Sequence, residues 1–151
     1  PVSMLDVSIR ADILNLLRAL AVDQGIALVM ITHDMSTVAA YSDRIAVMYL
    51  GRIVETGPAL QVLRHPQHPY TEALLSVVPV PHPDRRRARI ILRGETPDPA
   101  RLPDGCRFHP RCPKAFDRCP LTDPPMVEAG PGQWAACLLA VAEPPPDQGG
   151  T

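Results

Sequence analysis

Four cysteines stand in the second half of the 151-residue sequence, and thiolates are well suited to hold a soft metal centre. They are Cys106, Cys112, Cys119 and Cys137, separated by five, six and seventeen residues. Four thiolates can complete a tetrahedral Zn²⁺ site or ligate a [4Fe–4S] cluster. Zinc sites usually contain closely spaced Cys pairs, which are missing here, so the wider intervals favour the cluster. Zinc, or metal-free thiols and disulfides, are the alternatives.

The segment around these cysteines is poor in groups that could form a core. Between Asp104 and Leu138 it holds many prolines and few large apolar residues. Ordering the backbone costs about 1–2 kcal/mol per residue, which so small an apolar surface cannot offset. We therefore expect a metal centre to stabilise this segment. His109 lies inside it and is expected to stay outside the ligand set.

A second candidate is His33, which follows an unbroken apolar run from Ile26 to Ile31. The run does not alternate with polar residues, which is typical of a strand buried on both faces in a parallel sheet. Ligands of such sheets lie beyond the carboxyl ends of the strands, where His33 falls. A neutral imidazole there can donate to a phosphate oxygen or hold a water, and capping the next helix is the alternative role.

Other elements follow from local patterns. An apolar stripe predicts a helix over residues 7–24, with Gly25 as the residue after its end, and Asp34 is placed to cap a short helix over 35–41. Strands over 45–49 and 52–55 flank Leu50-Gly51 and predict a hairpin. Short helices are expected over 59–64 and 71–77, with a rigid Pro-containing turn between them rather than a metal site. Further strand-like pieces are 89–92, 125–128 and 133–136.

Composition divides the chain near residues 78–84. Ten of the fifteen Lys and Arg residues lie between Arg85 and Arg118, and fifteen of the nineteen prolines occur at Pro79 or later. The basic run Arg85–Arg89 is expected to be a solvated linker or a protein contact rather than a nucleic-acid site, because aromatic residues are scarce. The sequence contains neither a signal peptide nor an apolar run of the roughly 20 residues that span a bilayer. The cysteines thus suggest a reducing compartment.

The first 57 residues together resemble the distal part of an ABC transporter nucleotide-binding domain. Residues 1–8 look like the D-loop, Ile31-Thr32-His33-Asp34 looks like the switch-histidine motif, and residues 43–48 and 51–57 look like the closing strands. Met4 departs from the small residue common in that loop. A chain that begins with Pro and runs at once into a helix is expected to be the distal piece of a longer protein.

The next residues narrow the resemblance to oligopeptide and dipeptide importers. The His65–Leu75 segment is similar to the His-Pro-Tyr segment of their ATP-binding subunits, and Gly94–Pro97 and Gly105–Cys119 extend the match. Some subunits of this type are described as holding an iron–sulfur cluster, and the cysteine spacing here resembles theirs.

The resemblance implies an ATP-hydrolysing importer subunit that uses ATP with Mg²⁺. His33 would act at the γ-phosphate, and Ser3 and Asp6 would reach the nucleotide site of a second ATP-binding subunit. Partners would be two transmembrane permease subunits and, through them, an extracytoplasmic peptide-binding protein, at the cytoplasmic face of the membrane. The sequence has no Gly-x-x-x-x-Gly-Lys-Ser/Thr loop, so these 151 residues alone should not hydrolyse ATP.

The expected fold is α/β, the C-terminal half of a P-loop ABC nucleotide-binding domain followed by a small irregular module rich in Cys and Pro. The expected limits are 1–57 for the nucleotide-binding part, 58–80 for the His-Pro-Tyr segment, 81–140 for the Cys-rich module and 141–151 for a disordered tail. Alternatives are a non-catalytic metal-binding regulatory module, a nickel importer subunit and, less favoured, an ABC ATPase without a transport role.

Overall fold

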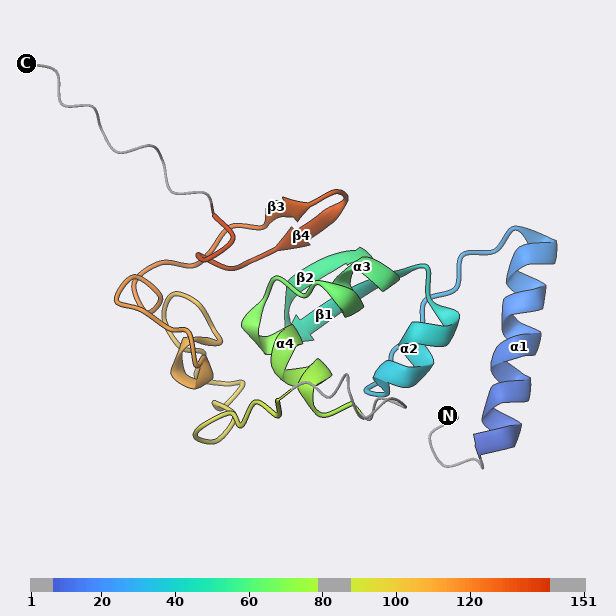
Figure 1. The fold of residues 1–151 in the computed structure, drawn as a ribbon, viewed down its shortest axis with the longest axis horizontal. Helices are drawn as coiled ribbons and strands as arrows, with labels where there is room; N and C mark the ends of the chain where they lie inside the picture. The colour runs from blue at the N-terminus through green and yellow to red at the C-terminus, as the bar shows by residue number, and fades with distance from the viewer. Residues whose placement is uncertain (1–6, 79–87, 142–151) are drawn as a thin grey trace, which may run out of the picture. The chain divides into compact units, whose positions relative to one another are not determined.

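A computed structural model describes residues 7–78 and 88–141 of the chain, in two compact units (Figure 1). One unit is Pro1–Ser42 and the other is Asp43–Thr151. The candidates Ser3 and Asp6, most of the composition boundary and the predicted tail beyond residue 141 lie outside the described residues. The domain limits given above stay a prediction.

The first unit contains two helices, both as predicted. Helix α1 (Val7–Gln24) ends where the Gly25 amide donates to Val22 O and the Ile26 amide to Ala21 O, at 3.3 and 2.9 Å, which satisfies two terminal carbonyls. Helix α2 (Met35–Tyr41) begins at Asp34, whose carboxylate accepts from the backbone amides of Ser36 and Thr37. None of the helices in residues 7–78 and 88–141 is long and apolar enough to cross a bilayer.

The predicted parallel strand over residues 26–31 is not found. The segment makes no strand pairing within the described chain, and its side chains are exposed, with Val29 at 87% and Ile31 at 98%. A strand requires a neighbour to receive its backbone hydrogen bonds, and the described part of this unit otherwise consists of helices. The apolar stripe of α1 is likewise uncovered, with Leu16 60% and Leu20 46% exposed.

The second unit is built on a four-stranded antiparallel sheet with the order β1-β2-β4-β3. The predicted hairpin is confirmed: β1 (Arg44–Tyr49) and β2 (Arg52–Pro58) flank Leu50 and Gly51, both with positive φ, 44° and 75°. This backbone is that of the two-residue turns that suit hairpins. The second hairpin, β3 (Val127–Gly130) and β4 (Gln133–Ala135), joins the edge of β2 through Trp134 and Ala135, which pair with Thr56 and Glu55, 78 and 80 positions earlier in the chain.

Two short helices follow β2. Helix α3 (Ala59–Arg64) has the predicted bounds and packs against β1 and β2. Helix α4 (Pro69–Ser76) begins two residues earlier than predicted, because Nδ1 of His68 accepts from the Tyr70 amide at 3.1 Å and Pro69 occupies the first turn. The turn between them is confirmed. Residues 89–92, predicted as a strand, carry no strand pairing in the described chain.

The side chain that joins these pieces is Glu55 on β2, which is fully buried. Its carboxylate accepts from the backbone amides of Gln67 and His68, at 2.8 and 3.0 Å, and from Nε2 of Gln133 at 2.7 Å. Gln133 also donates to the carbonyl of His65 at 2.9 Å. One carboxylate thus binds β2, the turn before α4 and the C-terminal hairpin together.

Replacing Glu55 with Ala is expected to destabilise this unit strongly. Three donors, two of them buried, lose their acceptor, which should lower the free energy of unfolding by about 3 kcal/mol. Urea denaturation followed by the fluorescence of Trp134, which lies beside Gln133 on β4, measures the change. Glu95→Ala, at an exposed residue, is the control and should change stability by less than about 0.5 kcal/mol. Equal stabilities for the two variants would contradict this role of Glu55.

Candidate functional site

The sequence-predicted site residues fall into different units. His33 lies in the first unit, exposed, between residues 26–31 and the N-cap of α2. The four cysteines lie in the second unit, in the loops between α4 and β3 and just after β4. None of them forms a disulfide, and Cys119 and Cys137 are buried while Cys106 and Cys112 are partly exposed.

The first three cysteines are held in a folded-back loop. The Cys106 amide donates to the Cys119 carbonyl at 2.9 Å, so the two ends of the loop meet. Gly105 stands at this crossing with φ +62°, and a Cβ there would lie 2.5 Å from the Cys119 carbonyl oxygen. Only glycine therefore fits, for lack of space as well as for its backbone conformation. A 3-10 turn, His109–Arg111, leads into Cys112.

One sulfur accepts a backbone hydrogen bond, and backbone N–H groups near the other three favour their thiolates. The Phe116 amide lies 3.5 Å from Sγ of Cys119, and the Lys114 amide lies near Cys112. The amides of residues 108 and 109 lie near Cys106, and those of residues 139 and 140 lie near Cys137. Backbone donors of this kind orient and stabilise thiolates that bind metals.

The thiols also share one electrostatic neighbourhood. Burial raises the pKa of Cys112 to about 11 and raises that of Cys106 and Cys137, and negative charge on neighbouring cysteines raises each pKa further. The four sulfurs would repel one another as thiolates, which a bound cation would offset. In residues 7–78 and 88–141, no group of three or more His, Cys, Asp or Glu side chains has the arrangement of an ion-binding site. The thiols thus lie near one another without closing on a point.

An aromatic cluster fixes this loop to the rest of the unit. Phe108, only 1% exposed, packs with Tyr49 of β1, with Tyr70 of α4 and with His68 at ring-centroid distances of 5.2, 5.3 and 5.6 Å. Because Phe108 is only two residues after Cys106, its packing in the cluster fixes the position of the cysteine loop against β1 and α4. Lys114 adds an ion pair with Glu72 of α4, at 2.7 Å.

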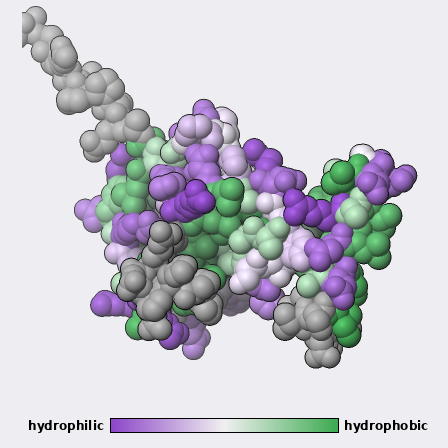
Figure 2. Space-filling view, turned by 45° about the vertical axis from the view of Figure 1, so that its right-hand side comes forward, coloured by the Kyte–Doolittle hydropathy of each residue, from purple (hydrophilic) through white to green (hydrophobic). Residues whose placement is uncertain are grey.

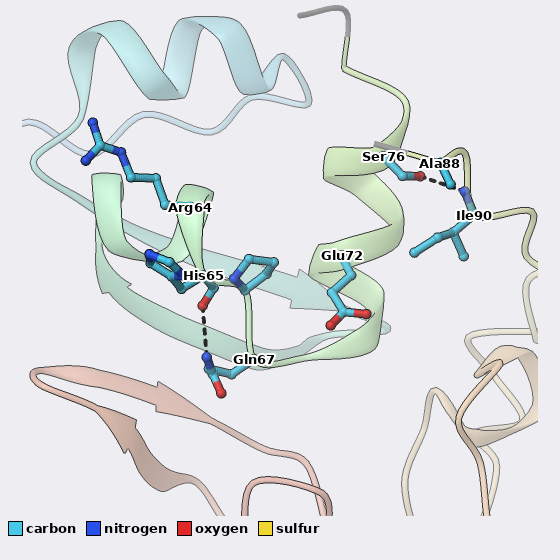
Figure 3. A pocket seen from close by; sticks show the side chains of 8 residues that line it. Arg64, His65, Gln67, Glu72, Ser76, Ala88 and Ile90 are labelled. Carbon is cyan, nitrogen blue, oxygen red and sulfur yellow. Dashed lines mark hydrogen bonds between the residues drawn. The ribbon is translucent and has the colours of Figure 1, made fainter. Parts of the chain in front are cut away.

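A cleft of about 440 Å³ opens beside α3 and α4 (Figure 3). Arg64, His65 and Gln67 line one side, and Glu72, Ser76 and Ile90 line another. Ser76 Oγ accepts from the Ile90 amide at 3.0 Å, and Glu72 is the partner of Lys114. The cleft therefore lies where the two helices meet residues 88–90.

Sequence reasoning missed the residues that carry this site. No sequence pattern marks Glu55. Val54 and Glu55 are both buried beside the irregular pairing of β2, so the usual alternation of buried and exposed residues does not identify it. In the sequence, Phe108 is only one of the few large apolar residues between Asp104 and Leu138. A signal was present for Phe108: it is one of only two phenylalanines in the sequence.

Comparison with known proteins gives this arrangement a context. Residues 54–119 match the family described as the C-terminal region of oligopeptide/dipeptide transporters. The match covers β2 from Val54 onward, the Glu55 carboxylate, the members His68, Tyr70 and Phe108 of the aromatic cluster, and three of the four cysteines. Residues 54–119 are thus similar to this family region.

Relatives match nearly the whole chain. A probable peptide ABC transporter ATP-binding protein of Sinorhizobium fredii is 52% identical over 136 residues, which is 90% of this chain and 38% of the relative. A dipeptide transport ATP-binding protein of Haemophilus influenzae is 47% identical over 91% of the chain, and a putative oligopeptide transport ATP-binding protein of Bacillus subtilis is 45% identical over 92%. The chain spans about two fifths of the length of these relatives, so the similarity covers one part of each of them.

The buried His68 predicts a pH dependence of this family region. Burial lowers the pKa of His68 from 6.5 to about 4, so the folded state keeps the ring neutral while the unfolded state takes up a proton below pH 6.5. Stability should therefore be full above pH 6.5 and fall by up to about 3 kcal/mol as the pH approaches 4. Urea denaturation between pH 7 and 4 measures the slope. His68→Asn, which keeps a capping side chain, should show a shallower slope, and an identical slope would contradict the assignment.

Proposed function

We propose that the chain is part of the ATP-binding subunit of an ABC importer that takes up oligopeptides or dipeptides. The observation that carries this proposal is the 45–52% identity to peptide-transport ATP-binding proteins over about nine tenths of the chain. The subunit would bind ATP with Mg²⁺, act with a second ATP-binding subunit, and sit on two permease subunits at the cytoplasmic face of the membrane. The permeases would receive peptide from an extracytoplasmic binding protein, and no nucleic acid takes part.

The uncovered surfaces of the first unit support the view that it belongs to a larger domain. Apolar side chains gather along α1, as Figure 2 shows, and the unpaired segment 26–31 exposes apolar groups on both of its faces. A monomeric protein rarely leaves so large an apolar surface in water. In the longer subunit we expect segment 26–31 to pair with strands of the nucleotide-binding sheet and α1 to cover that sheet.

The proposed catalytic role falls to His33. Asp34 holds the turn after it, since Oδ2 accepts from Oγ1 of Thr37 at 2.7 Å and the Asp34 amide donates to Oγ1 of Thr32 at 3.0 Å. This turn leaves the imidazole exposed and free of the capping role, which Asp34 performs. His33 would donate a hydrogen bond to the γ-phosphate and help to hold the attacking water. Ser3 and Asp6 would contact the nucleotide site of the second subunit.

In the full-length subunit, His33→Ala should lower the rate of ATP hydrolysis by about 10²–10³-fold, as does the loss of one charge-stabilising contact elsewhere. The affinity for ATP should change little, because the phosphate-binding loop supplies most of the binding. Phosphate release and nucleotide binding by the purified transporter measure the two quantities. His65→Ala, at another exposed histidine, is the matched control and should leave both unchanged. Wild-type turnover in His33→Ala would reject the catalytic assignment.

For the second unit we propose that Cys106, Cys112, Cys119 and Cys137 bind a [4Fe–4S] cluster, with Zn²⁺ as the alternative. The backbone N–H groups aimed at the sulfurs and the mutual repulsion of the thiolates support a metal centre. Such a centre would supply stability to a segment that has little core of its own. The cysteines would hold it, and Phe108 would seat their loop on the sheet.

Anaerobically purified protein should be brown, contain iron and sulfide, and absorb broadly in the blue region of the visible spectrum. Cys112→Ser should lose the colour, the iron and the protease resistance of residues 104–138. His109→Asn is the control: His109 Nδ1 contacts the Cys106 carbonyl at 2.9 Å, and as a non-ligand its replacement should leave the iron content unchanged. One equivalent of zinc in colourless protein would establish the alternative, and metal-free protein with a protease-resistant segment would end the metal hypothesis.

A further inference from the structure

The turn of the β1–β2 hairpin is fastened to the cysteine loop at two points. Arg107, the residue after Cys106, donates from Nη1 to the carbonyl of Leu50 at 2.5 Å. Arg52, at the start of β2, donates from Nη2 to the carbonyl of Pro124 at 2.6 Å and forms an ion pair with Asp123. Two residues at this turn, Leu50 and Arg52, thus bind two segments that are remote in sequence.

These two segments are the ones that carry neighbouring cysteines. Arg107 adjoins Cys106, and Asp123 follows Cys119 by four residues. The Cys106 amide and the Cys119 carbonyl bind each other at 2.9 Å, at the crossing where Gly105 leaves no room for a Cβ. The hairpin turn therefore holds both sides of this crossing, and holds them without supplying a ligand.

The arginines suit this role in geometry and in charge. A guanidinium presents several N–H donors in a rigid plane, so Arg52 can bind a carboxylate and a carbonyl at once, which an ammonium does less well. Its charge also reaches Cys106: it favours the thiolate, and so lowers the pKa that burial raises. A cationic group beside a cluster of thiolates stabilises their negative charge.

We propose that Arg52 and Arg107 are positioning residues of the four-cysteine metal site: they clamp the Cys106–Cys119 crossing to the β1–β2 turn and so preorganise it for the metal. This inference rests on the metal site proposed above. It assigns to the β1–β2 hairpin a direct hold on the cysteine loop. Residues outside the ligand set that orient the ligands typically change metal affinity 10–100-fold.

The test uses the chain purified anaerobically, with Arg52→Gln, Arg107→Gln and Arg52→Lys, and with Arg44→Gln as the matched control. Arg44 is exposed at the far end of β1, and its guanidinium donates to the carbonyl of Gly132 on the β3–β4 turn at 3.4 Å, away from the cysteine loop. Iron and sulfide per chain, and the rate of iron release to a chelator, are measured for each. Arg52→Gln and Arg107→Gln should release iron about tenfold faster than wild type or more, and Arg44→Gln at the wild-type rate.

Arg52→Lys separates the charge of Arg52 from its geometry. The reduction potential of the cluster, measured by EPR during titration with dithionite, should be lower in Arg52→Gln and near wild type in Arg52→Lys, because only the first loses the charge. Iron release should be fast in both, because both lose the planar pair of donors. A wild-type release rate in Arg52→Gln and Arg107→Gln would overturn the clamp.

Failure of the clamp and failure of the metal site give different results. If the wild-type chain contains neither iron nor zinc, the metal site is rejected. The effect of the two arginines on the cysteine loop is then measured without metal. Amide hydrogen exchange over residues 104–124 should then be faster in Arg52→Gln and Arg107→Gln than in Arg44→Gln. Equal exchange in all three variants would show that the arginines do not hold the crossing.

Discussion

The buried carboxylate of Glu55 is the constraint on which the second unit depends. A carboxylate without solvent needs donors on its oxygens, and here the chain supplies two backbone amides and one side-chain amide. Those donors belong to two separate pieces, so the requirement of one side chain fixes the turn before α4 and the strand β4 against β2. Gly57 allows the same approach from the backbone side, because a Cβ there would lie 3.0 Å from Cα of Gln133.

The cysteine loop has little regular structure and is positioned from outside. Phe108 enters an aromatic cluster built by β1 and α4, Lys114 pairs with Glu72, and two arginines join the loop to the hairpin turn. Each contact joins residues 38 or more positions apart, so the loop takes its shape from the sheet and helices rather than from its own sequence. The positions of the four cysteines are thus set by contacts that involve no metal.

Local sequence signals predicted local structure well. The Asp34 cap, the Leu50-Gly51 hairpin and the limits of α3 each depend on a few adjacent residues, and each is confirmed. Pairing between remote segments was beyond such reasoning: nothing in residues 133–135 indicates that they extend the sheet beside Glu55. The strand predicted over 26–31 is the opposite error. Its apolar run is typical of a strand with neighbours on both sides, and the described chain provides no such neighbours. For the site, the thiols could be listed from the sequence, whereas the clamp and the aromatic seat could not.

The pairing of β2 with β4 has a consequence for biosynthesis. The β1–β2 hairpin is complete once its own residues have left the ribosome, but Gln133 emerges 78 residues after Glu55. At about 5–20 residues per second, translation leaves the nascent hairpin with an open edge and a carboxylate short of one donor for on the order of ten seconds. During that interval water must solvate Glu55, which keeps this face of the hairpin wet. Closure of the sheet is thus a late event, timed by the arrival of the C-terminal strands at the ribosomal exit.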